Sequence, residues 1–501
     1  MATKVPTVAD FDELHVISDL HLGGKRDFQI FGSTAELVWL IDDLRQRAPA
    51  TRIGLVINGD FVDFLAQAPA LPFDPEGATD KLAGIAADLT FIPIFDALRR
   101  FTATDDRYLI VNLGNHDLEF ALPWVREKLL DIISGGDRSA RGRIMLALDG
   151  AGVLLNVGGA QVLCVHGNEV DAWNLADYER IRRIGRDFTQ GRGIEPWVPN
   201  GGSQLVTQVM NPLKQCFPFI DLLKPEGPAV FPTLIALDPA VVTEIGKVSA
   251  AFTRRTWDAV REATGFLEAV SDPTGDAVAQ APGAVLSDAP LRDVRRQREE
   301  MARDLMDRTE DRWRDDTVAL DLVASDQRAE YVGIAGAMGK FFAGKGTVEA
   351  LREALDNLDK DRSFDFGTED GTYRELDGRV GANIDFLITG HTHLERALRR
   401  RRGSGCYFNG GTWARLIQIP PQLRQNPVEF AKLFDRLKAG TMAVLDGRAA
   451  EPGVTLRRCS VVSIWRESGT TVGELRHVAA QPGAAAVFAA QPVPNTRLSV
   501  T

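Results

Sequence analysis

The sequence predicts an α/β fold that is interrupted by a large, mainly helical insertion. In the first 170 residues, short apolar runs rich in β-branched residues alternate with amphipathic stretches such as 35–47 and 123–133. This alternation is typical of βαβ units in a parallel or mixed sheet. The second observation is that more than 200 residues, whose composition favours helices, separate His166 from Gly390.

Five apolar runs are predicted to be strands, because each is short and bounded by Gly or Asp. They occupy residues 14–18, 53–58, 108–113, 162–165 and 384–389. Every run ends in a polar block, and together the blocks hold five of the seven histidines. In chain order the blocks are Asp19-Leu-His21, Gly59-Asp60-Phe-Val-Asp63, Gly114-Asn115-His116-Asp117, His166-Gly167 and Gly390-His391-Thr-His393.

The position of these blocks predicts a single site. Loops beyond the carboxyl ends of the strands in an open α/β sheet converge on a ligand crevice. The blocks therefore bring carboxylates, one amide and several imidazoles to one edge of the sheet. Hard oxygen ligands mixed with imidazoles suit borderline divalent transition metals. We therefore expect a metal site at this edge.

The order and content of the five blocks resemble the calcineurin-like metallophosphoesterase superfamily. The resemblance covers roughly residues 12–170 and 380–415. Single blocks carry little information, but Gly-Asn-His-Asp and Gly-His-Thr-His are more specific, and all five occur in register. The resemblance implies a sandwich of two mixed β-sheets flanked by helices. It also implies hydrolysis of a phosphoester or pyrophosphate bond that depends on two divalent metal ions.

The resemblance further implies which residues hold each metal. Manganese is expected first, with iron, zinc or nickel as alternatives. Two ions about 3.5–4 Å apart can bind a phosphoryl group and generate hydroxide from a shared water. The first metal would be held by Asp19, His21, Asp60 and His393, and the second by Asp60, Asn115, His166 and His391. The carboxylate of Asp60 would bridge the two ions.

Three further residues of the blocks are assigned other roles by the resemblance. His116 would protonate the leaving oxygen or stabilise charge on the phosphate. Asp117 would orient the imidazole of His116, and Asp63 would hold a ligand or loop amides without touching metal. His15 and His477 match no block, so we assign them no catalytic role. Since no Ser or Cys nucleophile accompanies the blocks, direct attack by a metal-bound hydroxide is expected.

The substrate class is open at this stage. Residues 17–23 and 59–64 are similar to the UDP-2,3-diacylglucosamine pyrophosphatase branch, but that branch often has Arg in place of His116 and has a far shorter lid. A nuclease would share the five blocks. Protein Ser/Thr phosphatases are disfavoured, because Phe64-Leu65 replace the Arg-Gly that follows their second block. An inactive metal-binding interaction scaffold is the alternative of another class, and the complete ligand set argues against it.

The amino-acid composition restricts the classes of binding partner that we expect. The net charge of −11 argues against a general nucleic-acid binder. The resemblance implies that the substrate is a phosphorylated small molecule or a lipid-linked phosphate, and a nucleic acid is disfavoured but stays an alternative. Four scattered cysteines indicate reduced thiols, which is typical of a cytoplasmic protein. Met1 to Glu13 lacks the apolar core of a secretory signal, and no apolar run is long enough to span a membrane.

The expected domains are a core in two parts, at 12–171 and 379–478, with a cap insertion at 172–378 and a disordered tail at 479–501. Helices are expected at 243–270 and 291–314, with a loop at 271–290 between them. Strands are expected at 442–445 and 461–465. Because the insertion begins just after His166 and ends just before His391, its stems should lie near the metals, where loops commonly set specificity.

Two stretches outside the blocks have alternative interpretations. Residues 206–242 are apolar and interrupted by prolines, which favours a packed cap over an exposed apolar groove. Four arginines at 399–402 follow the last block. A charged turn exposed to solvent is the first interpretation of this run, and recruitment of a phosphate is the second.

Overall fold

The computed structural model describes residues 9–171, 173–224, 226–237, 346–356, 362–448, 451–452, 455–481 and 484–500. The helices expected at 243–270 and 291–314, and the loop at 271–290, lie outside these ranges. The chain divides into two compact units. Unit 1 comprises residues 1–226, 360–420 and 431–501, and unit 2 comprises residues 227–359 and 421–430.

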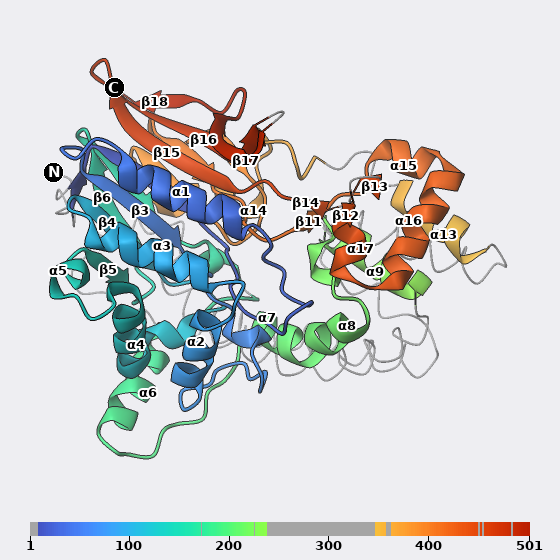
Figure 1. Ribbon diagram of the computed structural model, residues 1–501, viewed down its shortest axis with the longest axis horizontal. Coiled ribbons are helices and arrows are strands. Elements are labelled where there is room, and N and C mark those ends of the chain that lie inside the picture. Colours follow the sequence, from blue (N-terminus) through green and yellow to red (C-terminus); the bar gives the residue numbers. More distant parts are fainter. Residues whose placement is uncertain are drawn as a thin grey trace, which may run out of the picture. The chain divides into compact units, whose positions relative to one another are not determined.

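The larger sheet of unit 1 has eight strands and is mixed (Figure 1). Its parallel part consists of β2 (Glu13–Ile17), β3 (Ile53–Asn58), β4 (Arg107–Asn112) and β5 (Ile144–Ala147). An antiparallel part continues from β2 through β15 (Ser460–Glu467), β16 (Thr470–Gln481) and β17 (Ala484–Pro492), with β18 (Leu498–Val500) also paired to β16. Every residue of β3 is buried, as expected for a parallel strand covered on both faces.

The second sheet of unit 1 has six strands. Their spatial order is β1 (Asp10–Phe11), β6 (Val153–Val157), β7 (Ala160–Cys164), β8 (Phe386–Thr389), β10 (Cys406–Asn409) and β9 (Arg396–Arg399). Strands β6 and β7 form the antiparallel hairpin that leads to His166. Strand β8 pairs in parallel with β7, so the chain returns from the insertion directly beside the strand from which it left.

Alternating side chains divide the core of unit 1 into two layers. On β3, Leu55 and Ile57 belong to the cluster beneath the helices, whereas Val56 belongs to the cluster between the sheets. On β4, Leu109 and Ile110 divide in the same way. Successive side chains of a strand point to opposite faces, so one strand contributes to both layers. The expected sandwich of two mixed sheets flanked by helices is confirmed.

Three helices pack on the outer face of the larger sheet: α1 (Thr34–Gln46), α3 (Ile92–Ala103) and α4 (Pro123–Ser134). Their bounds agree with the stretches expected at 35–47 and 123–133. In α3, Ile94, Leu98 and Phe101 recur at helical spacing and are buried. Gly135 ends α4 with φ 60°, a left-handed conformation that glycine adopts without a steric cost.

Helix α14 (Gly371–Arg379) packs on the outer face of the second sheet, where Tyr373 contacts Tyr407 with ring centroids 5.0 Å apart. The arginine run after the last block is anchored to this helix. Arg400 is buried and donates from Nε to Asp377 Oδ1 at 2.8 Å, while Arg401 pairs with Glu369. Arg400 is therefore not the solvated side chain expected, because its cation is held by a buried carboxylate.

The C-terminal segment corrects the expectation of a disordered tail at 479–501. It completes β16 and forms β17 and β18. Phe488 packs against Trp39 of α1, with ring centroids 6.4 Å apart. The Ala/Pro-rich composition suggested disorder, but hairpin pairing with β16 and the packing of Phe488 on α1 supply the order, and the contact with α1 leaves no local pattern.

The strand expected at 442–445 is also corrected, because α17 (Met442–Asp446) occupies this position. The side chain of Thr441 caps the helix by accepting from Val444 N. A short apolar run is compatible with either structure, and the cap residue decides between them. The strand expected at 461–465 is confirmed within β15.

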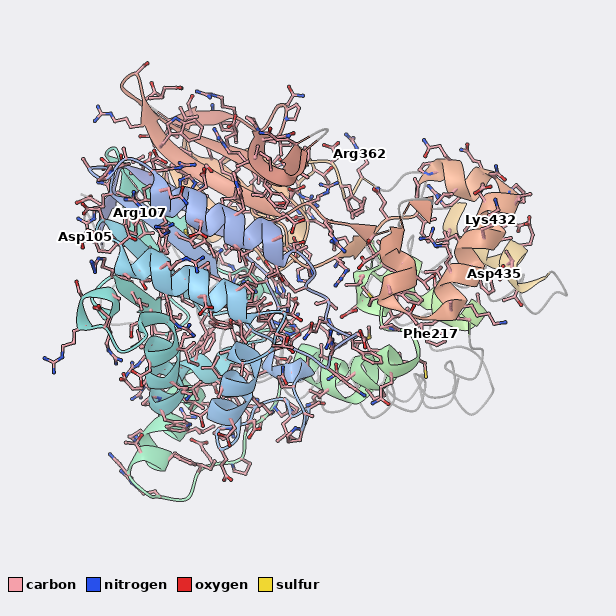
Figure 2. All side chains as sticks on the ribbon, viewed as in Figure 1. Asp105, Arg107, Phe217, Arg362, Lys432 and Asp435 are labelled. Atoms are coloured by element: carbon pink, nitrogen blue, oxygen red, sulfur yellow. The ribbon has the colours of Figure 1, made fainter. Side chains whose placement is uncertain are left out.

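The first part of the insertion lies in unit 1. It forms α6 (Tyr178–Thr189), α7 (Gly201–Leu205), the π-helical turn η4 (Val206–Met210), α8 (Asn211–Cys216) and η5 (Ile220–Leu222). Phe217, labelled in Figure 2, stacks edge-on against Phe219 with ring centroids 6.2 Å apart. Phe219, Ile220 and Leu223 are buried. Their burial agrees with a packed segment rather than an open apolar groove.

Unit 2 contains α9 (Glu226–Leu237), α13 (Thr347–Asp356) and α15 (Pro421–Gln425). Arg352 Nη1 donates to Arg424 O at 2.9 Å, and Arg424 donates in turn to Leu355 O. These two bonds join α13 and α15. The longer α16 (Pro427–Ala439) begins in unit 2 and ends in unit 1.

Short elements complete the described chain. They are α2 (Ala78–Ala86), α5 (Arg138–Arg141), η1 (Phe64–Ala66), η2 (Leu118–Ala121), η3 (Asn168–Val170), β11 (Leu416–Ile417), β12 (Gly447–Arg448), β13 (Glu451–Pro452) and β14 (Thr455–Leu456). Among the helices in the described ranges, none combines the length and apolarity that crossing a bilayer requires.

Candidate metal centre

The five polar blocks lie at the carboxyl ends of strands β2, β3, β4, β7 and β8, as the sequence predicts. The first three strands belong to the larger sheet and the last two to the second sheet. Both sheets therefore contribute to one site. Asp19, Asp60 and His166 are buried, and polar groups buried at this density need partners or a ligand.

The backbone is left-handed at several of the predicted ligands. A non-glycine residue pays roughly 1–2 kcal/mol for this conformation. The φ angles are 55° at Asp19, 48° at His21, 51° at Asp60, 67° at His391 and 61° at His393. Strained backbone persists only where the surroundings hold it in place, and it concentrates at functional sites. The strain at five ligands thus supports a shared function.

Glycine is required in the blocks because atoms of neighbouring side chains lie where a Cβ would be. A Cβ at Gly59 would lie 2.3 Å from His166 Nδ1, and one at Gly114 would lie 2.2 Å from Asp60 Oδ1. A Cβ at Gly390 would lie 1.9 Å from Ser18 Oγ. Any larger residue would displace a neighbouring site side chain, which explains why Gly accompanies the ligands in the sequence.

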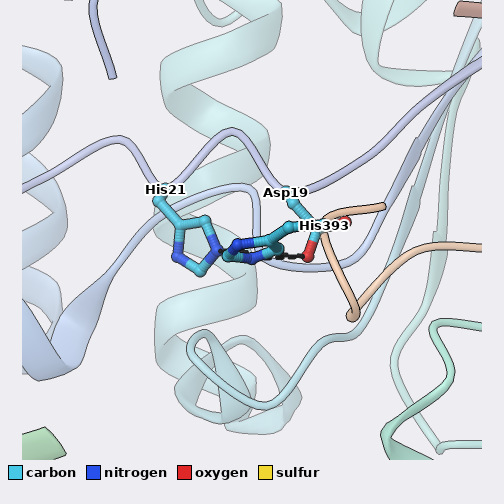
Figure 3. Close-up of side chains that lie close together, drawn as sticks. All are labelled: Asp19, His21 and His393. Atoms are coloured by element: carbon cyan, nitrogen blue, oxygen red, sulfur yellow. Dashed lines mark hydrogen bonds and ion pairs between the residues drawn. The ribbon is translucent and has the colours of Figure 1, made fainter. Parts of the chain in front are cut away.

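The first group of ligand atoms consists of Asp19, His21 and His393 (Figure 3). His393 Nε2 lies 3.0 Å from His21 Nε2 and 3.3 Å from Asp19 Oδ1. Burial lowers the pKa of His393, which favours the neutral ring that can bind a metal. Two ring nitrogens 3.0 Å apart can share either a proton or a cation. This geometry fits the first predicted metal.

The second group consists of Asp19, Asp60 and His166. His166 Nε2 lies 3.2 Å from Asp60 Oδ2, and its Nδ1 lies 2.8 Å from Asn58 O. Because Nδ1 carries the proton donated to Asn58, a neutral ring would present the Nε2 lone pair to a carboxylate. Burial lowers the pKa of His166, but the charge and hydrogen bond of Asp60, together with the charges of Asp19 and Glu169, outweigh it and raise the pKa to about 10. A metal ion at Nε2 would take the place of that proton.

Asn115 presents an unsatisfied amide oxygen to the site. Its Nδ2 donates to Asn174 Oδ1 at 3.4 Å, and its Oδ1 is buried with no hydrogen-bond partner among the described residues. His166 Nε2 likewise has no hydrogen-bond partner there. Buried polar atoms are rarely left unsatisfied. These two are the atoms that a second metal would require, so the residues fit the implied ion.

His391 lies beside the second group. Its ring centroid is 5.4 Å from that of His166, and its backbone N–H donates to Asp19 at 3.1 Å. Its Nε2 is 2.8 Å from Asp171 Oδ2. Among the described residues, His391 is outside the three tightest groups of ligand atoms. The bond to Asp171 leaves Nδ1 as the ring nitrogen for a metal.

His116 faces the same centre from β4. It forms a group with His21 and Asp60, and its ring is edge-on to His21 with centroids 4.6 Å apart. Burial lowers the pKa of His116, but the charges of Asp63 and Asp60 raise it to about 9. A histidine with this pKa is protonated at neutral pH, as a proton donor must be.

Asp63 and Asp117 exchange the roles that the sequence suggested. Asp63 Oδ1 lies 3.1 Å from His116 Nδ1, so Asp63 orients the imidazole. The carboxylate of Asp117 instead accepts from Gly114 N and Phe61 N, both at 2.7 Å. Burial, followed by the charge of Asp60, raises the pKa of Asp117 to about 8. Asp117 thus fixes two loops of the site, because adjacency in sequence does not set side-chain direction.

Other polar residues at the site were not predicted. Asn58 Nδ2 donates to Val165 O at 2.8 Å, and Asn58 accepts from Asn112 Nδ2 at 3.0 Å. Ser18 Oγ donates to Asp19 and to Asn58 O. Ser18 and Asn58 are the last polar residues before their blocks, and this position could have identified them. Asp171 and Asn174 follow no comparable pattern.

Comparison with known proteins agrees with this geometry. Residues 14–216 match the calcineurin-like phosphoesterase family. The matched segment contains Asp19, His21, Asp60, Asn115 and His166, while His391 and His393 lie beyond it. No curated protein matches the chain. A calcineurin-like phosphoesterase hydrolyses phosphoester bonds with divalent metals, and the Asp and His groups described above could bind such ions.

Residues of the insertion contact the loops around the candidate site at two points. Asn211 Nδ2 of α8 donates to Leu65 O at 2.8 Å, close to Asp63. Lys224 N donates to Ile417 O at 2.9 Å, just after the segment that contacts Asp19. Within unit 1, the segment of the insertion that contains Asn211 and Lys224 therefore lies against the edge of the sheet at which the ligands gather.

Proposed function

We propose that this chain is a phosphohydrolase with a dinuclear metal centre held by the two groups of side chains. The observation that carries the proposal is the convergence of unsatisfied ligand atoms, His166 Nε2 and Asn115 Oδ1, beside the carboxylate of Asp60. Asp60 also lies 3.6 Å from His21 Nε2, so it faces both groups. A carboxylate between two groups of ligands can bridge two ions.

The proposed assignment is the one that the family resemblance implies, and the groups of ligand atoms support it. Asp19, His21, Asp60 and His393 would hold one ion, and Asp60, Asn115, His166 and His391 the other. When bound, the ions would bind the phosphoryl group and lower the pKa of water to supply the nucleophile. Manganese is the proposed metal, because carboxylate and carbonyl oxygens suit it, while the imidazoles keep iron, zinc and nickel as alternatives.

The chain's own residues would handle the leaving group. The Nδ1 atom of His116 faces Asp63, so Nε2 remains for the substrate. The negative charge of Asp63 stabilises the imidazolium, which keeps a proton on Nε2 at neutral pH. His116 would donate that proton to the departing oxygen. Asp117 contributes by holding the backbone at Gly114 and Phe61 in place.

The test is hydrolysis of bis(p-nitrophenyl) phosphate by protein that has been stripped of metal and reloaded with Mn²⁺. We expect turnover only in the loaded protein, with two ions bound per chain. Loaded protein that binds two ions yet hydrolyses neither this diester nor a panel of monoesters, nucleotide diphosphate-lipids and nucleic acids would overturn the proposal. That outcome would favour the inactive scaffold.

We also propose that the insertion at 172–378 sets substrate choice. The support is the contact of Asn211 with Leu65 beside the site. Removing this hydrogen bond with Asn211→Ala should change the ratio of kcat/KM between small and bulky phosphodiesters by about fivefold, as expected for one hydrogen bond of ~1 kcal/mol. Metal content should stay the same. An unchanged ratio would contradict the proposal.

A further inference from the structure

Asp171, Trp173 and Asn174, which we call the 171–174 turn, lie where the first part of the core meets the insertion. Within it, Trp173 N donates to Asp171 Oδ1 at 2.9 Å, and Asn174 Nδ2 donates to Asp171 Oδ2 at 2.7 Å. These bonds hold the carboxylate of Asp171 and the amide of Asn174 in fixed orientations. Each side chain has a further polar atom that reaches a predicted ligand.

The first contact is between Asp171 and His391. Asp171 Oδ2 lies 2.8 Å from His391 Nε2, which is a short bond for a nitrogen donor and a carboxylate. A carboxylate accepts but does not donate, so Nε2 must carry the proton. The neutral ring then has its lone pair at Nδ1. Asp171 therefore selects which nitrogen of His391 is available to a metal.

The second contact is between Asn174 and Asn115. Asn174 Oδ1 accepts from Asn115 Nδ2 at 3.4 Å. The two ends of an amide are distinguished only by their hydrogen bonds. By accepting from the NH₂ end, Asn174 turns the carbonyl oxygen of Asn115 to the buried position where it lacks a hydrogen-bond partner among the described residues. An amide binds a metal through this oxygen.

The 171–174 turn is itself clamped by its neighbours. Gly202 N of α7 donates to Trp173 O at 2.7 Å, and Asn168 Nδ2 donates to Asn174 O at 3.1 Å. A Cβ at Gly202 would lie 1.9 Å from Asn174 Oδ1. The tight packing means that the turn cannot shift without moving α7, so the two contacts to the ligands are held rigidly.

We propose that Asp171 and Asn174 are positioning residues for the second metal: one turn fixes the donor atoms of both His391 and Asn115. The inference rests on the proposed function, which assigns these two ligands to the same ion. The first metal is held differently, since His21 and His393 face each other and Asp19. The 171–174 turn therefore controls one ion of the pair, and it couples that ion to the insertion.

The test is calorimetric titration of the full-length, metal-free protein with Mn²⁺. Wild type is expected to bind two ions. Asp171→Asn should weaken the second ion 10–100-fold, the usual effect of removing a residue that orients a metal ligand, and leave the first unchanged. Asn174→Ser should weaken the same ion. It provides an independent measurement if Asp171→Asn does not fold.

The matched control is Asp177→Asn. Asp177 lies on the same stem of the insertion and caps α6 by accepting from Arg180 N at 2.9 Å. Asn is also a good cap residue, so both ions should bind as in wild type. Equal weakening of both ions in Asp171→Asn, or equal affinity in Asp171→Asn and Asp177→Asn, would overturn the positioning role. Wild type that fails to bind two ions would overturn the proposed function and this inference together.

Discussion

In the described chain, buried polar groups are hydrogen-bonded at one end of the parallel strands β2, β3 and β4, whereas some lack hydrogen-bond partners at the other. At the amino end, Arg107 is buried, and its guanidinium donates to Thr51 O at 2.7 Å and Arg47 O at 2.6 Å (labelled in Figure 2). At the carboxyl end, His166 Nε2 and Asn115 Oδ1 are buried without hydrogen-bond partners among the described residues. The amino end is satisfied by the chain itself, whereas the carboxyl end is arranged for a ligand.

Two histidines of one strand region show the same contrast. His15, within β2, bonds to Ser463 Oγ at 2.9 Å and approaches Glu13 Oε2 at 3.2 Å. His21, just beyond β2, faces His393 Nε2 and has an unpartnered Nδ1 within the described residues. Burial alone therefore does not mark a functional histidine. What distinguishes His21 is that its Nε2 faces two other predicted ligands, His393 at 3.0 Å and Asp60 at 3.6 Å.

The largest effect of a substitution at the carboxyl end is expected at Asp60. Asp60→Ala should abolish tight metal binding and hydrolysis while preserving the fold, because Asp60 faces both groups of ligands. Elemental analysis of the purified variant decides the outcome, and two tightly held ions would contradict the assignment. Asp12→Ala is the control, since Asp12 accepts from Arg52 N at the amino end and should not affect metal content.

A smaller effect is expected at His116. His116→Ala should lower turnover by about 10²–10⁴, the usual range for general acid catalysis, without removing metal. The loss should shrink for nitrophenyl esters, whose leaving groups need little protonation. Turnover should therefore be measured on good and poor leaving groups in parallel. An equal loss on both would assign His116 to phosphate binding instead.

A substitution at the amino end of the strands should lower the stability of the protein and leave its activity unchanged. Arg107→Met removes a cation that donates to several carbonyls, and those buried oxygens would lose their partners. We expect a loss of about 2–4 kcal/mol in the free energy of unfolding, since bonds to charged groups and unsatisfied acceptors are the costly kind. Urea denaturation measures it. If Arg107→Met lost metal but kept the same free energy of unfolding, the two ends would not differ as described.

The smallest effect is expected from Glu13, next to His15. Its hydrogen bond to His15 is the main cause that lowers its pKa to about 2, with Arg47 adding to the effect. A carboxylate with a depressed pKa contributes stability above pH 4.5 that is lost as pH falls toward 2. Glu13→Gln should remove this dependence of stability on pH. The change in the free energy of unfolding should be about 1 kcal/mol at most, because the pair is partly exposed. Unfolding curves at pH 3 and pH 7 test it.

Local patterns predicted the parts of the molecule that depend on neighbouring residues. The apolar runs before Asp19, Asp60 and Asn115 are strands, and their blocks meet at one edge. These predictions succeeded because a strand end and its following turn are encoded within a few residues. The helices at 35–47 and 123–133 were predicted for the same reason.

The parts that the sequence did not reveal depend on distant contacts. Strand β17 pairs with its neighbour β16, but Phe488 of β17 packs on Trp39 of α1, which is distant in the sequence. Asp171 reaches His391 across 220 positions in the sequence. Asp63 replaces Asp117 beside His116, because side-chain direction on a tight loop is set by packing. No residue pattern within one block could supply these facts.

The separation between His21 and His393 has a consequence for biosynthesis. Their ring nitrogens are 3.0 Å apart, although 372 positions separate them along the chain. A ribosome adding ~5–20 residues per second needs roughly 20–70 s to cover that distance. Throughout this interval the nascent chain carries only part of the ligand set, and β2 lacks its neighbour β15. One edge of the central sheet therefore stays unpaired in the emerging polypeptide until β15, at Ser460–Glu467, has been synthesised.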